Sequence, residues 1–217
     1  MQFGFKQVFN SSLLIAAVYF LYLMLLITLQ YIPINFNVAF LRIKNAEIEL
    51  LYYQIAFFTH VYSSIFVLGF GIIQLIPWVR KNNSKWHKTF GKFYVGITLF
   101  LSAPSGFIMA IHANGGIWGK TSFLLLSILW FYFTLKAFLK AKKGEWEKHQ
   151  NFMYRSFALT FSAVSLRLFK WILANTLALP PMDMYVLVSW LGWTINLLIV
   201  ELKIVFRNKR NGSIFAV

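Results

Sequence analysis

The chain contains six apolar segments that are each long enough to cross a lipid bilayer, and this pattern limits its fold more than any other feature. A membrane-spanning helix needs about 20 mainly apolar residues. These segments are continuously apolar, whereas the strands of a transmembrane β-barrel alternate in polarity. We therefore predict an all-α, polytopic membrane protein whose six helices form one bundle and one transmembrane domain over residues 1–217. The predicted helices cover residues 12–31, 55–78, 93–111, 122–139, 152–174 and 185–206.

The composition excludes several other classes of protein. Hydrophobic residues make up 59% of the chain and charged residues 12%, about half of what a soluble domain carries. A soluble enzyme, a disordered tail and a nucleic-acid module are therefore excluded, although the net charge is +15. The chain has no cysteine, which rules out disulfides, Cys-ligated metal centres and covalently attached haem c.

The distribution of basic residues predicts the orientation in the membrane. Lys and Arg are enriched in cytoplasmic loops. We assign most of the 21 Lys and Arg residues to the face that carries both termini, so the termini are expected to be cytoplasmic. The basic loops are expected to contact anionic lipid headgroups, and nucleic acid is not an expected partner. The opposite face receives only Arg42, Lys44, Lys120, Arg167 and Lys170.

The four histidines fall into two pairs, one at each predicted membrane face. His60 and His112 share one face, and His87 and His149 share the other. The helix from His87 to His112 would be about 37 Å long at 1.5 Å per residue, which exceeds the roughly 30 Å hydrocarbon thickness. These two residues therefore cannot serve one centre, and the natural partition is one pair in each leaflet.

Each histidine pair could hold one haem b iron between two neutral imidazoles. Lys92 and Arg155 could then serve the propionates of the inner haem, and Arg167 those of the outer haem. Two alternatives remain open. The chain could bind one haem or another metal, or the histidines could lie among headgroups without binding any metal.

The positions of Arg167 and of the acidic residues also indicate which activities other than haem binding the chain could have. Arg167 lies well inside the fifth predicted helix, either as the partner of an anionic group or as a snorkelling anchor. No carboxylate falls at mid-membrane, which disfavours a cation-coupled transporter. We find no hydrolase or transferase signature and expect no catalytic residue beyond electron transfer.

Two short motifs carry a family resemblance. The first runs from Trp86 to Tyr94 and reads Trp-His-Lys-Thr-Phe-Gly-Lys-Phe-Tyr; the second runs from His149 to Ser156 and reads His-Gln-Asn-Phe-Met-Tyr-Arg-Ser. With His60, Gly71 to Gln74, Gly115-Gly116 and Arg167, they resemble the bacterial predicted membrane proteins of domain of unknown function 2306. This resemblance implies a multi-pass protein of the bacterial inner membrane and no settled activity. A more distant similarity is to cytochrome b561 and ferric-reductase-like di-haem bundles, whose paired ligands come from alternate helices.

These observations leave three functional hypotheses. The first is a di-haem b-type transmembrane electron carrier with quinone or redox-protein partners. The second is a non-catalytic accessory or assembly subunit that packs against a larger membrane complex or a second copy of the chain. The third is a small-molecule or lipid transporter that uses a kink at Pro104.

Overall fold

The computed structural model describes residues 5–210, and every regular element in this range is helical. This confirms the predicted all-α class. The predicted cytoplasmic termini lie outside the described residues. The elements are α1 (Phe5–Leu29), a 3₁₀ turn (Ala39–Ile43), α2 (Asn45–Ile48), α3 (Leu51–Leu75), α4 (Pro77–Asn82), α5 (Ser84–Ile97), a π-helix (Thr98–Ser102), α6 (Ala103–Ile111), α7 (Gly116–Lys142), α8 (Trp146–Thr160), α9 (Ser162–Thr176) and α10 (Pro181–Arg210).

Five helical stretches in the described range are long and apolar enough to cross a membrane, and a bent pair makes a sixth candidate. The bent pair is α8 and α9, whose axes meet at 43°. The structure therefore agrees with the predicted segments in number and order. The five single stretches are Ser12–Leu29, Leu51–Leu75, Ser84–Ile111, Gly116–Lys142 and Pro181–Lys209.

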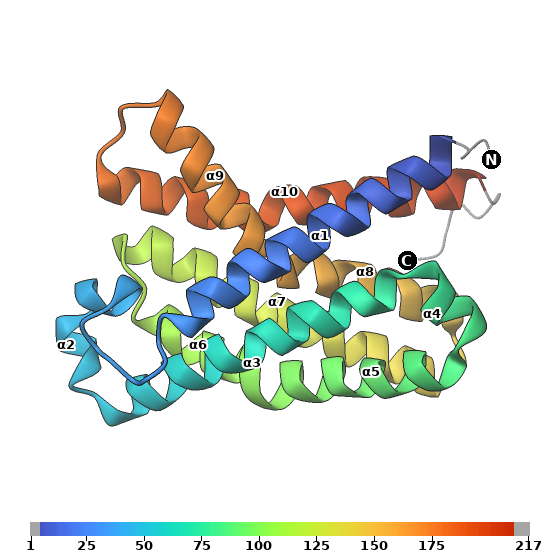
Figure 1. Ribbon diagram of the computed structural model, residues 1–217, viewed down its shortest axis with the longest axis horizontal. Coiled ribbons are helices and arrows are strands. Elements are labelled where there is room, and N and C mark those ends of the chain that lie inside the picture. Colours follow the sequence, from blue (N-terminus) through green and yellow to red (C-terminus); the bar gives the residue numbers. More distant parts are fainter. Residues whose placement is uncertain (1–4, 211–217) are drawn as a thin grey trace.

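Four spans form the centre of the molecule. α3 packs against the α5–α6 span and against α8, and α7 packs against the same two spans. α3 and α7 are therefore diagonally opposed across this four-helix core, as are the α5–α6 span and α8. α1 crosses over α3, and α10 packs against α7, α8 and α9 (Figure 1).

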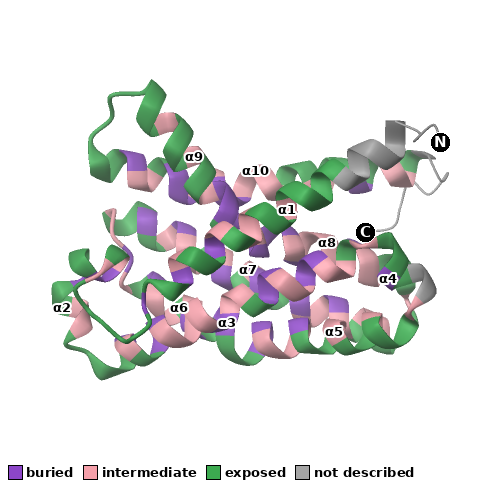
Figure 2. Cartoon of the chain, in the orientation of Figure 1, coloured by how far each residue is buried: buried purple, intermediate pink, exposed green. Residues whose placement is uncertain are grey.

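The interior of the core combines apolar and hydroxyl side chains. Val67, Tyr94, Trp130 and Leu159 are buried together at its centre. Figure 2 shows buried positions mainly on the facing sides of these helices and exposed positions on the outside of the bundle, where many large hydrophobic side chains lie. An apolar outer surface is expected for a helix bundle whose solvent is lipid instead of water.

The α5–α6 span passes through a π-helix instead of breaking at Pro104. Proline has no backbone N–H and cannot continue an α-helical hydrogen-bond ladder. The N–H of Ala103, just before it, bonds to the carbonyl of Thr98 five residues earlier. The wider turn absorbs the defect, and π-turns of this kind often occur at functional sites.

The α8–α9 bend contains neither proline nor glycine. At the bend the hydroxyl of Ser162 donates to the carbonyl of Leu159 at 2.6 Å, and that of Thr160 donates to the carbonyl of Ser156 at 3.1 Å. Such side-chain bonds compete with the helical ladder and bend helices. α9 consequently leaves the core and packs mainly on α10 (Figure 1).

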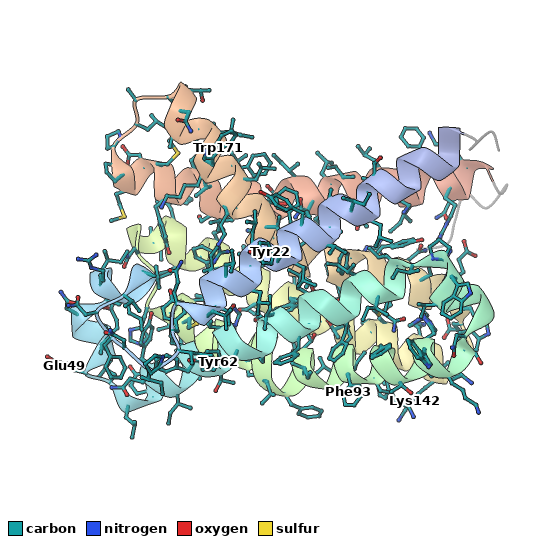
Figure 3. The ribbon with its side chains drawn as sticks, in the orientation of Figure 1. Tyr22, Glu49, Tyr62, Phe93, Lys142 and Trp171 are labelled. Carbon is teal, nitrogen blue, oxygen red and sulfur yellow. The ribbon has the colours of Figure 1, made fainter. Side chains whose placement is uncertain are left out.

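The two ends of the bundle differ in charge. We call the end formed by residues 76–92 and 140–150 the Lys-rich end; residues 30–50, 112–118 and 176–184 form the opposite end. Lys142 and Glu49 mark these two ends in Figure 3. At the opposite end, the buried Lys44 donates to Glu47 at 3.0 Å, to Asn114 at 2.6 Å and to the carbonyl of His112.

Candidate functional site

His149 lies in the first turn of α8 at the Lys-rich end, and α7 fixes its ring. Its Nδ1 is 2.8 Å from the carbonyl oxygen of Ala137. A carbonyl oxygen can only accept, so Nδ1 carries the proton and donates, and in the neutral ring Nε2 keeps its electron pair. Metal-binding histidines commonly have this arrangement, with one nitrogen donating to a backbone carbonyl and the other facing the metal.

His87 lies in the first turn of α5, at the same end. The Asn83 side chain caps this helix by accepting from the N–H of Trp86 at 3.2 Å. The carbonyl of His87 accepts a hydrogen bond from Gln74 of α3 at 2.9 Å. Its Nδ1 is buried and has no hydrogen-bond partner within residues 5–210. A buried polar atom without a partner is costly in a folded protein, and this nitrogen is free to take one.

The structure places His87 and His149 at the same end of the bundle, in the first turns of α5 and α8. The two side chains lie within electrostatic range of each other. They come from diagonally opposed helices, α5 and α8. The core here offers two ring nitrogens with no protein partner, the donor set that would suit the iron of one b-type haem.

The two positive side chains predicted to serve the inner haem, Arg155 and Lys92, differ in whether they already have an ion-pair partner. Arg155 is held by Glu201 of α10, with Nε to carboxylate oxygen at 2.5 Å and a second contact at 2.8 Å. This paired geometry makes Arg155 a link between α8 and α10 and leaves it poorly placed for a propionate. Lys92 is exposed on α5 and remains available for an anionic group.

The structure does not bring His60 and His112 together. The ring of His60 packs so tightly on Gly106 that a Cβ there would lie 2.9 Å from it. His112 lies about 9 Å farther along the chain at 1.5 Å per residue. Two axial nitrogens on one metal, each about 2 Å from it, would be only about 4 Å apart. The predicted outer haem does not fit this pair.

Both of these histidine side chains already contact other residues. His112 hydrogen-bonds the hydroxyl of Tyr52 through Nε2 at 2.9 Å and packs edge-on to Tyr53. His60 faces Trp130 of the diagonally opposed α7, with ring centroids 6.5 Å apart.

Arg167 lies on α9 and is exposed. Its NH1 donates to the carbonyl of Ala163 at 2.8 Å, one turn back toward the bend. The guanidinium therefore points toward the middle of the membrane span, the reverse of a snorkelling anchor. None of the ion pairs within residues 5–210 includes Arg167.

A buried hydroxyl network at the centre of the core was not predicted. The hydroxyl of Tyr94 lies 2.8 Å from that of Ser156 and 2.7 Å from that of Thr160. Thr134 hydrogen-bonds Ser156 at 2.7 Å, and Trp130 donates to Thr160 at 3.0 Å. The available signal was Ser156 and Thr160, spaced four apart on one helix face. The network links α5, α7 and α8 without any carboxylate.

Comparison with known proteins places the chain in a family without an assigned activity. The model of the family described as predicted membrane protein, domain of unknown function 2306, matches residues 57–204. This range includes all four histidines and Arg167. No curated protein and no solved structure matches the chain. The distant similarity to cytochrome b561 is therefore not shown by the comparisons.

Proposed function

Because the chain belongs to the domain of unknown function 2306 family of predicted membrane proteins, which carries no assigned activity, we propose a function from its core. We propose that it binds one haem b at the Lys-rich end, between His87 and His149, and acts as a membrane-embedded electron-transfer component. The observation that carries this proposal is the buried Nδ1 of His87, which has no hydrogen-bond partner within residues 5–210, at the end of the bundle that also holds His149.

The residues of the chain would each have a defined part. His149 would bind through Nε2, because its Nδ1 donates to Ala137. His87 would bind through a ring nitrogen, held at its backbone by Gln74. Lys92 is the available cation for a propionate. The haem would supply reversible one-electron chemistry, and His87 and His149 would hold it and influence its potential.

The proposal also concerns location. The Lys-rich end would face the cytoplasm, since basic loops are retained there, and we propose the bacterial inner membrane as its place. The electron donor or acceptor on that side would be a soluble or membrane-bound redox partner. Its contact surface would be the basic residues of α5 and of the α7–α8 loop.

The test is the visible absorption spectrum of the full chain, expressed with ample haem and purified in detergent. We expect a Soret band in the wild type that is lost in His87→Ala and in His149→Ala. His112→Ala is the matched control, because His112 is bonded to Tyr52 at the opposite end, and it should keep the band. A wild type without a Soret band, or equal losses in all three variants, would overturn the proposal.

A further inference from the structure

A groove lies between the beginnings of α7 and α10, at the end of the bundle opposite the proposed haem. Its volume is about 600 Å³, and residues of both helices line it. They include Gly115 and Trp118 at the start of α7, and Asp183, Leu187 and Trp190 on α10. None of the four histidines lines this groove, so it is separate from both haem sites that the sequence predicted.

Close packing between α7 and α10 fixes the two walls of the groove. Gly115 has a left-handed backbone, and a Cβ there would lie 2.6 Å from the side chain of Val186. Farther along the same contact, the hydroxyl of Ser122 donates to the carbonyl of Ser189 at 2.8 Å, and the indole of Trp193 donates to Ser122 at 3.0 Å. These contacts hold the walls at a set separation without a bound molecule.

The lining of the groove changes from charged to apolar along α10. Asp183 lies in the first turn of this helix. Leu187 and Trp190 follow it four and seven residues later, which places the three side chains on one face of the helix. At 1.5 Å per residue, Trp190 starts about 10 Å deeper in the membrane span than Asp183. A molecule with a charged head and an apolar tail has the same order.

The charge at the shallow end of the groove is negative. The side chain of Asp183 is exposed, and it forms no ion pair and no hydrogen bond within residues 5–210. None of the described residues that line the groove is basic. Trp118 in the same groove is also exposed, and an indole ring attracts cations. In a chain with a net charge of +15, this groove is a place that favours a cation.

We propose that this groove binds a phospholipid whose head group carries an ammonium group, as phosphatidylethanolamine does. The ammonium would lie against the carboxylate of Asp183 and the ring of Trp118, and one acyl chain would follow Leu187 and Trp190 into the membrane. Charge complementarity selects the head group, and the apolar lining beyond it selects a lipid over a soluble amine. An anionic phospholipid is disfavoured here, because its net negative charge would meet that of Asp183.

The experiment is native mass spectrometry of the delipidated full chain in detergent, titrated with one lipid at a time. The probes are phosphatidylethanolamine and phosphatidylglycerol with the same acyl chains. We expect saturable binding of one phosphatidylethanolamine that depends on Asp183, and phosphatidylglycerol binding that does not. Ethanolamine, which has the ammonium without the acyl chains, should not displace the lipid. Displacement by an equal concentration of ethanolamine would show that the groove takes a soluble amine, and would overturn the lipid assignment.

Two variants test the lining residues. Asp183→Asn removes the charge and keeps a side chain that suits the start of a helix. It should weaken phosphatidylethanolamine binding about fivefold, the upper range for an exposed ion pair. Trp118→Leu keeps an apolar side chain but loses the ring, and should weaken binding about two- to fivefold. Glu49→Gln removes an exposed carboxylate at the same end of the bundle but outside the groove; it is the control and should bind as the wild type does.

The lipid test and the haem test can fail independently. His149→Ala should leave phosphatidylethanolamine binding unchanged, because His149 lies at the Lys-rich end. Unfolding temperatures of the variants identify any loss of binding that comes from misfolding. Equal phosphatidylethanolamine binding by the wild type and Asp183→Asn, or saturable phosphatidylglycerol binding that Asp183→Asn abolishes, would overturn the inference.

Discussion

At the scale of single residues, Gly71 shows how closely α3 approaches its neighbours. A Cβ at Gly71 would lie 2.5 Å from the ring of Phe157, and 3.1 Å from Tyr94. The rings cannot retreat easily, because Tyr94 is buried in the core and Phe157, partly buried, packs against that core. Gly71→Ala should therefore destabilise the protein by about 1–3 kcal/mol, the usual cost of overpacking.

Gly96 provides the matched control for this substitution. It also lies inside a helix, yet a Cβ there would meet no atom within 4 Å. Gly96→Ala should be neutral or stabilising by up to about 1 kcal/mol, because alanine is the better helix former. Thermal unfolding in detergent compares the two variants, and equal effects would contradict the packing described here.

The hydroxyl of Tyr94 is the second residue whose contribution can be measured. It is shared between Ser156 and Thr160 in the buried network. Tyr94→Phe should cost about 1–2 kcal/mol, since both partners lose a bond inside a medium without water. Tyr132→Phe changes an exposed ring and should have no measurable effect in the same unfolding assay. A neutral Tyr94→Phe would show that the network adds no stability.

At the scale of elements, the loop before α3 is closed by the bond between Lys44 and Glu47. Burial, the largest single influence, would raise the pKa of Glu47. The hydrogen bond from Lys44, a backbone hydrogen bond and the charges of Lys44 and His112 together outweigh it and leave the pKa below its usual value of 4.5. A carboxylate whose pKa is lower in the folded than in the unfolded protein stabilises the fold at pH values above its pKa in the unfolded protein. That contribution disappears as the pH falls through the lowered pKa.

Hydrogen exchange tests this closure. Amide protection over residues 39–48 should fall as the pH is lowered from about 6 to below the lowered pKa of Glu47. Glu47→Gln should abolish this pH dependence, because the neutral amide cannot titrate. Glu49→Gln removes an exposed carboxylate and should retain it. Protection that falls equally in all three proteins would show that another group controls the loop.

The helices themselves were largely predictable from the sequence, and their irregularities were not. Long apolar runs give the number and order of the spans because the bilayer fixes their length. The π-helix before Pro104 and the bend at Ser162 leave backbone carbonyls without their usual helical N–H donors. Both irregularities depend on which other groups donate hydrogen bonds to these carbonyls. Those partners, such as the His60 ring on Ser102, come from other helices and leave no local pattern.

At the scale of the whole molecule, the orientation rests on the charge difference between the two ends. The chain has no cysteine, so single cysteines can be introduced as clean reporters. Lys143→Cys, in the loop after α7, should resist a membrane-impermeant maleimide in intact cells. Ile34→Cys, in the loop after α1, should react with it. Both positions are exposed, and the reverse pattern of labelling would contradict the proposed cytoplasmic face.

The candidate site was predictable only in part. Assigning a histidine to a membrane leaflet gives its depth in the membrane but not the side of the helix on which its ring lies. Depth alone paired His87 with His149 and His60 with His112. The structure separates the second pair, since His112 bonds to Tyr52 and His60 faces Trp130. The side of a helix on which each ring lies depends on packing between helices, which a single sequence does not state.

The number of haems bound per chain tests the central claim most directly. It is measured by a pyridine haemochrome assay on the purified, haem-replete protein, against its concentration from amino-acid analysis. We expect one haem per chain, because His87 and His149 share the Lys-rich end, whereas His112 is bonded to Tyr52 and His60 to the carbonyl of Ser102. None bound would refute the site at the Lys-rich end, and two would show that the opposite end also holds a haem despite Trp130.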